Sequence, residues 1–97
     1  MCVYIPLANP GEFEVYNTTF LEGVELEGRP EVTTWSGSGC SGEAKIIRYD
    51  EDGYSIRLTG CKGHEFYFTI TDKATKKEYY FKYYFNQDKN TVLVERR

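Results

Sequence analysis

The residues of this chain best suited to chemistry are three cysteines and a single histidine. Cys40 and Cys61 lie in matching Gly-Cys-x-Gly segments, and His64 follows Cys61 by three residues. A thiol close to an imidazole could form a nucleophilic pair, and with Cys2 the four side chains could ligate zinc. However, the spacing matches no zinc finger or ribbon, and no carboxylate is evident that would orient the imidazole. We therefore expect no metal, no cofactor and no enzymatic activity.

The same cysteines can instead form a disulfide, in which Cys61 bonds to Cys2 or to Cys40. One thiol is left over in either case, because the count is odd. Such a bridge would stabilise so small a core by about 2 to 4 kcal/mol. Cysteines at this density are typical of a secreted domain. Met1 is expected to be a start residue that precedes a mature secreted sequence beginning at Cys2.

The chain after residue 42 shows a regular alternation of apolar and polar residues. In 54–59 and in 66–71, an apolar or aromatic side chain occurs at every second position. A period of two is typical of strands that turn one face toward a core. Short segments rich in glycine, asparagine, aspartate and lysine separate the runs, as tight turns require. The sequence therefore predicts an antiparallel meander with almost no room for a helix.

The best-defined unit is a hairpin formed by 43–49 and 54–60. Its turn, Asp50-Glu51-Asp52-Gly53, ends in a glycine that can adopt the left-handed conformation of a type I turn with a bulge. This pairing places Cys40 and Cys61 close together at the open end. The other expected strands are 2–7, 12–16, 24–27, 31–35, 66–71, 78–85 and 91–95.

These strands predict an all-β fold, namely a small antiparallel β-sandwich or barrel of six to nine strands. At 97 residues the chain is expected to be a single domain over 1–97. The apolar members of the clearest alternating pairs are expected to form the core, and they are Phe13, Val15, Ile56, Leu58, Phe66, Phe68, Ile70 and Phe81.

The densest aromatic segment is 79–85, which contains six aromatic residues and one lysine. In a strand it places Tyr80, Lys82 and Tyr84 on the face opposite to 79, 81, 83 and 85, and Tyr67 on the preceding strand joins them. That face is either covered by another strand or forms an aromatic and cationic patch for a protein, a sugar or a single-stranded nucleic acid. We predict that Tyr67, Tyr80, Lys82 and Tyr84 belong to a partner-binding surface.

The formal net charge of −3 argues against a general nucleic-acid binder, because that activity depends on neutralising phosphates. No apolar run approaches the length of a membrane span. The charge is uneven, since 1–52 contain ten acidic and three basic side chains and 53–97 contain five and nine. Either the two halves pair across neighbouring strands, or a polarised surface steers a charged partner. We expect a secreted monomer that binds neither nucleic acid nor a membrane.

Three segments resemble the MAX effectors (Magnaporthe avirulence and ToxB-like), which are small secreted fungal virulence proteins. They are the opening Met1-Cys2-Val3-Tyr4-Ile5, the dipeptide Gly39-Cys40, and the hairpin from Gly42-Glu43-Ala44-Lys45-Ile46-Ile47-Arg48 to Tyr54-Ser55-Ile56-Arg57-Leu58-Thr59-Gly60-Cys61.

The resemblance implies a six-stranded sandwich of two antiparallel sheets with a disulfide between Cys2 and Cys61. It also implies a non-enzymatic effector that binds a host plant protein through exposed strand edges and surface patches. The alternative function is an extracellular protein inhibitor or a carbohydrate-binding module. An exposed edge strand and a disulfide-bonded sulfur would favour the effector, and a concave aromatic groove containing Trp35 would favour the carbohydrate module. A reactive Cys61 beside His64 would favour an enzyme.

Overall fold

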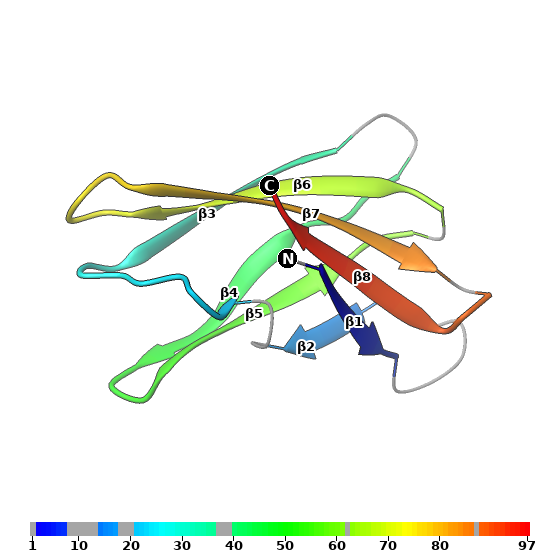
Figure 1. Cartoon of the computed structure of the whole chain (residues 1–97), viewed down its shortest axis with the longest axis horizontal. Helices are drawn as coiled ribbons and strands as arrows, with labels where there is room; N and C mark the ends of the chain where they lie inside the picture. Colours follow the sequence, from blue (N-terminus) through cyan, green and yellow to red (C-terminus); the bar gives the residue numbers. More distant parts are fainter. Residues whose placement is uncertain (1, 8–13, 18–20, 37–39, 62, 87) are drawn as a thin grey trace.

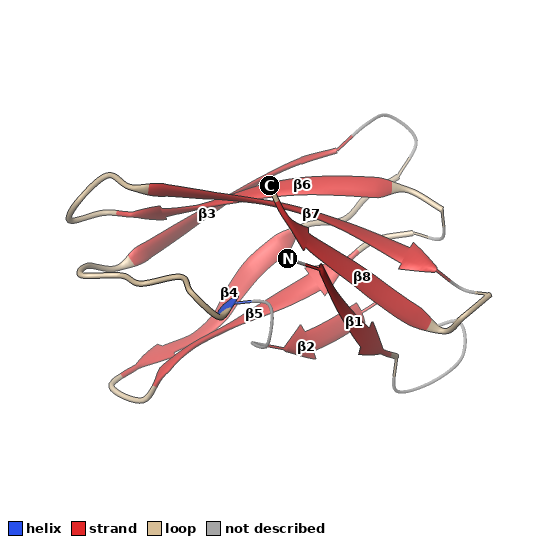
Figure 2. Ribbon diagram, in the orientation of Figure 1, coloured by secondary structure: helices blue, strands red, loops and turns tan. Residues whose placement is uncertain are grey.

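The computed structural model describes residues 2–7, 14–17, 21–36, 40–61, 63–86 and 88–97. Strands make up nearly all of its regular structure (Figure 2), so the predicted all-β class is confirmed. Their bounds are β1 Cys2–Pro6, β2 Glu14–Asn17, β3 Pro30–Ser36, β4 Ala44–Asp50, β5 Gly53–Thr59, β6 Glu65–Asp72, β7 Glu78–Asn86 and β8 Thr91–Arg96.

The strands form two antiparallel sheets (Figure 1). The five-stranded sheet has the order β1-β8-β7-β6-β3, and the three-stranded sheet has the order β2-β5-β4. Strands β6, β7 and β8 make a meander, as the alternation predicted, while β1 and β3 from the first half of the chain occupy the two edges. The sandwich thus has eight described strands, where the resemblance implied six.

The core lies between the two sheets and is rich in aromatic rings. It follows from the period of two, because 66, 68 and 70 on β6 and 79, 81, 83 and 85 on β7 all point inward and are buried. The three-stranded sheet contributes Ile56, Leu58 and Ala44. Phe68 stacks on Phe81 with ring centroids 4.9 Å apart.

Six residues of the predicted core are buried as expected: Ile56, Leu58, Phe66, Phe68, Ile70 and Phe81. Phe13 lies outside the described residues. Val15 lies on β2 opposite Leu58, and its side chain is not described. The alternation in the second half of the chain thus identified six core residues correctly.

The strand expected over 24–27 is absent, and that prediction was wrong. The carboxylate of Asp72, at the end of β6, accepts hydrogen bonds from the backbone N–H groups of Glu27 (2.7 Å), Gly28 (3.0 Å) and Ala74 (2.9 Å). The Asp72 side chain thus binds the backbone N–H groups of Glu27 and Gly28, which are then not available for hydrogen bonds to a neighbouring strand. Asp72 is 1% exposed. These hydrogen bonds, of which the one from Glu27 has the largest effect, lower the pKa of Asp72 to about 2.

Candidate functional site

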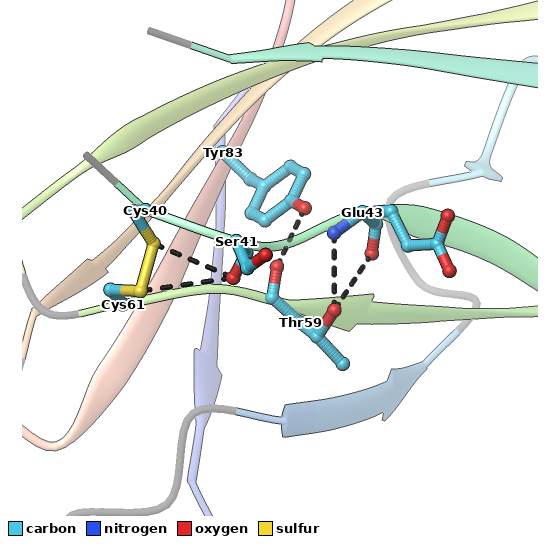
Figure 3. Close-up of a disulfide and its surroundings, with 6 residues drawn as sticks. All are labelled: Cys40, Ser41, Glu43, Thr59, Cys61 and Tyr83. Atoms are coloured by element: carbon cyan, nitrogen blue, oxygen red, sulfur yellow. Dashed lines mark hydrogen bonds between the residues drawn. A yellow bond between two sulfur atoms is a disulfide. The ribbon is translucent and has the colours of Figure 1, made fainter. Parts of the chain in front are cut away.

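The disulfide joins Cys40 to Cys61, whose Cα atoms are 6.1 Å apart. The β4–β5 hairpin brings them together, because Ala44 pairs with Leu58 and the backbone N–H of Thr59 donates to Glu43. Figure 3 shows the bridge just beyond this end of the hairpin, with the carbonyl oxygen of Ser41 3.5 Å from Sγ of Cys40.

The predicted bridge between Cys2 and Cys61 was wrong, and the alternative from the hairpin register is the one that forms. Cys2 lies on edge strand β1 of the other sheet, opposite Glu95, and is an exposed free cysteine. The resemblance placed it near Cys61, whereas the strand order places it across the sandwich from the hairpin.

This bridge leaves no free thiol beside His64. The backbone N–H of His64 donates a hydrogen bond to the carbonyl oxygen of Cys61, at 3.3 Å. Within the described ranges, no group of three or more His, Cys, Asp or Glu side chains is placed to hold a metal ion. The geometry thus favours neither the Cys-His pair nor the zinc site that the sequence raised.

The feature that stands out is the face of the five-stranded sheet directed away from the core, which we call the outer face. Its central row follows the strand register, in which Trp35 on β3 lies opposite Tyr67 on β6, Tyr67 opposite Lys82 on β7, and Lys82 opposite Glu95 on β8. A neighbouring row runs from Thr33 through Thr69 to Tyr80. Side chains from four strands are therefore brought together by pairing alone.

A hollow of about 540 Å³ lies between these two rows. We call it the aromatic groove and define it by Thr33, Trp35, Tyr67, Thr69, Tyr80 and Arg97. Trp35 is 66% exposed and Tyr80 is 46% exposed, and the threonines Thr33 and Thr69 lie side by side on neighbouring strands. The groove therefore has aromatic walls and a polar floor.

The walls are held by specific contacts. The rings of Trp35 and Tyr67 lie 5.5 Å apart at 48°, and the guanidinium of Arg97 lies 4.9 Å from the centre of the Tyr67 ring. The backbone N–H of Arg97 donates to the carbonyl oxygen of Tyr80 at 2.8 Å, which fixes the arginine beside the groove. Arginine stacked in this way keeps its N–H edge available for hydrogen bonds.

Glutamates two residues away hold the tyrosine hydroxyl groups of the groove. Tyr67 donates to Glu65 at 3.0 Å, and Tyr80 donates to Glu78. The bond to Glu78, together with its negative charge, raises the pKa of Tyr80, so this hydroxyl stays protonated at neutral pH. The rings consequently have fixed directions before any ligand arrives.

A second, smaller hollow of about 150 Å³ lies farther along the outer face, and its lining includes Tyr84, Leu93 and the pair Lys82–Glu95. Nζ of Lys82 lies 3.2 Å from Oε2 of Glu95, and this carboxylate raises the pKa of Lys82. The lysine is charged at neutral pH, but its charge is already paired.

The structure places all four predicted partner-binding residues, Tyr67, Tyr80, Lys82 and Tyr84, on the outer face. Tyr80 is exposed and the other three are half-buried. Strand β7 pairs on both sides, so its residues can offer side chains but no unpaired backbone; the edges of this sheet are β1 and β3. The role of these four residues in binding a partner stays a prediction.

Sequence reasoning missed Arg97 and the position of Trp35 beside Tyr67. The sequence suggested Trp35 as a groove residue but not its neighbours, since the pairing of β3 with β6 joins residues thirty or more positions apart.

No protein-family model, curated protein or solved structure matches this chain. Among the described residues, no helix has the length and apolar character needed to cross a membrane.

Proposed function

We propose that the chain is a non-enzymatic extracellular carbohydrate-binding module that holds its ligand in the aromatic groove. The observation that supports this proposal best is the combination of exposed aromatic walls, from Trp35 and Tyr80, with a floor that includes Thr33 and Thr69.

A sugar ring has an apolar face of C–H groups and an edge of hydroxyl groups. An aromatic ring offers the matching apolar surface with a negative π-face. Threonine hydroxyl groups donate and accept, and Arg97 donates, so the same groove can pair with sugar hydroxyl groups. An apolar protein side chain would instead leave these polar groups unpaired, at a cost in affinity.

Preorganisation is the second argument. The walls belong to paired strands of one sheet, and the hydroxyl groups of Tyr67 and Tyr80 are held by Glu65 and Glu78. Rigid aromatic side chains lose little conformational entropy when they bind, so even an open groove can give useful affinity. The Cys40–Cys61 disulfide is compatible with an extracellular protein.

The test is calorimetric titration with cello-, manno- and chito-oligosaccharides. We expect at least one series to bind and Trp35→Ala to abolish that binding with little change in melting temperature, since this ring is largely exposed. Tyr49→Ala is the matched control, because Tyr49 is as exposed as Tyr80 (46% each) but lies on β4 of the other sheet. Failure of all three series would contradict the proposal.

A second candidate function is the secreted effector that binds a host plant protein. It is favoured by edge strand β1, which pairs on one side only, and by Tyr4 on that strand, which is 69% exposed. An edge strand can accept an extended partner segment, and exposed tyrosines are common interface anchors.

A pull-down from plant extract tests the second candidate. Tyr80→Ser combined with Tyr84→Ser should leave the melting temperature nearly unchanged and abolish capture of the partner. Unfolding of this double variant would show that the rings of Tyr80 and Tyr84 are structural, and would remove these two residues from both candidate functions.

A further inference from the structure

We infer that the outer face takes a linear oligosaccharide that crosses the strands diagonally, from Trp35 at edge strand β3 to Tyr4 at edge strand β1. The inference rests on the proposed function and adds the direction and minimum length of the ligand.

The strand register places the relevant side chains in a diagonal series, made of two neighbouring rows that are two residues apart along the strands. Trp35 pairs with Tyr67 at one edge, while at the other edge Tyr84 pairs with Leu93 and Leu93 pairs with Tyr4. The series crosses five adjacent strands. With neighbouring strands about 4.8 Å apart, it spans roughly 19 Å, which is longer than a single sugar ring.

Exposure follows the same line. The two most exposed large hydrophobic side chains of the described residues, Tyr4 (69%) and Trp35 (66%), lie at its two ends on the same face. The smaller hollow beside Tyr84 and Leu93 lies between them, and the aromatic groove adjoins the Trp35 end. Exposed rings beside two hollows fit a ligand made of repeated units.

The direction follows from how the rings are distributed. Exposed or half-buried rings of the outer face come from four strands: Tyr4 on β1, Trp35 on β3, Tyr67 on β6, and Tyr80 and Tyr84 on β7. Along β7, the one strand with two such rings, the paired charge of Lys82 lies between them. A ligand running along a strand, or along one row of paired residues, would meet two rings at most. A ligand crossing the sheet diagonally meets four, namely Trp35, Tyr67, Tyr84 and Tyr4.

Oligosaccharides of two lengths test the contributions of the two ends of the surface separately. Affinities for the disaccharide and the hexasaccharide of the cello-, manno- and chito-series are measured for the unchanged protein, Tyr4→Ala, Tyr4→Phe and Trp35→Ala, with Tyr49→Ala as control. We expect Tyr4→Ala to weaken hexasaccharide binding about tenfold and leave disaccharide binding unchanged, while Tyr4→Phe retains both. Trp35→Ala should weaken the binding of both ligands.

Each outcome has a defined meaning. Equal affinity of the unchanged protein for the short and long ligands, with no effect of Tyr4→Ala, would overturn the inference and leave the groove proposal intact. Binding of neither ligand in any series would overturn both. Melting temperatures of all variants are recorded, so that a loss caused by unfolding is recognised; Tyr4→Phe, which keeps the ring, then decides whether the ring is needed.

Discussion

Tyr83 offers a sharp test of how the two sheets are held together. It lies on β7 with 0% of its surface exposed, its ring stacks on Phe66 at 5.0 Å, and its hydroxyl donates to the carbonyl oxygen of Thr59 on β5 at 2.8 Å (Figure 3). This bond joins the five-stranded sheet to the three-stranded sheet. Tyr83→Phe removes the hydroxyl and leaves the ring in place.

The expected magnitude follows from the burial of this bond. A typical hydrogen bond contributes about 1 kcal/mol, and a buried acceptor left without a donor costs about 1–3 kcal/mol. Because a carbonyl oxygen can accept a second bond, we expect the lower part of this range, a loss of about 1–2 kcal/mol in the free energy of unfolding. For a domain of this size that lowers the melting temperature by roughly 4–16 °C.

Tyr54→Phe is the matched control, since the same atom is removed from another tyrosine with a buried hydroxyl. The hydroxyl of Tyr54 is buried, and none of the described residues hydrogen-bonds with it. Burial, with the nearby Tyr79, raises its pKa to about 12. Removing a buried hydroxyl that has no partner should leave the free energy of unfolding unchanged or raise it by up to about 1 kcal/mol.

Urea denaturation followed by circular dichroism measures both variants under identical conditions. The expected result is a lower midpoint for Tyr83→Phe at unchanged denaturant dependence, and an equal or higher midpoint for Tyr54→Phe. Equal losses in the two variants would refute it, because the effect would then not depend on whether the hydroxyl has a partner.

Three further changes have defined outcomes. Cys40→Ser with Cys61→Ser, which opens a loop of sequence separation 21, should lower the free energy of unfolding by about 3 kcal/mol, measured by urea denaturation. Asp72→Asn should flatten the acid limb of a melting-temperature profile: the ionised carboxylate stabilises the fold above its ordinary pKa of 3.8, and this stabilisation is lost as the pH falls toward 2. Gly42→Ala should cost about 1–3 kcal/mol by the same assay, because its Cβ would lie 2.5 Å from the carbonyl oxygen of Thr59.

Local alternation predicted much of the second half of the fold. Strands β4 to β8 were expected close to their observed bounds, and Phe66, Phe68 and Ile70 point inward because a period of two allows no other arrangement once one face is apolar. The hairpin turn was also available, since Gly53, at φ 133°, has the positive φ expected of the turn glycine, whereas the register shift between Ile46 and Arg48 was not expected. These features depend on residues close in the sequence.

The features that sequence reasoning missed depend on distant partners. The segment 24–27 alternates like a strand, but Asp72, some 45 residues away, binds the backbone amide of Glu27. The correct disulfide required knowing that Cys2 belongs to a different sheet from the hairpin that leads to Cys61. The aromatic groove likewise required the pairing of β3 with β6, because Trp35 and Tyr67 are neighbours only across that ladder. Periodicity indicates which way a side chain points and not which strand lies beside it.

The pairing of β1 with β8 also bears on how the chain reaches its native state. Cys2 lies opposite Glu95, so the first strand finds its partner only in the last one. During synthesis β1 therefore stays unpaired until β8 has left the ribosome, and closing so long a loop is slow. In that interval this early strand, with its exposed Tyr4 and free Cys2, is open to wrong pairing.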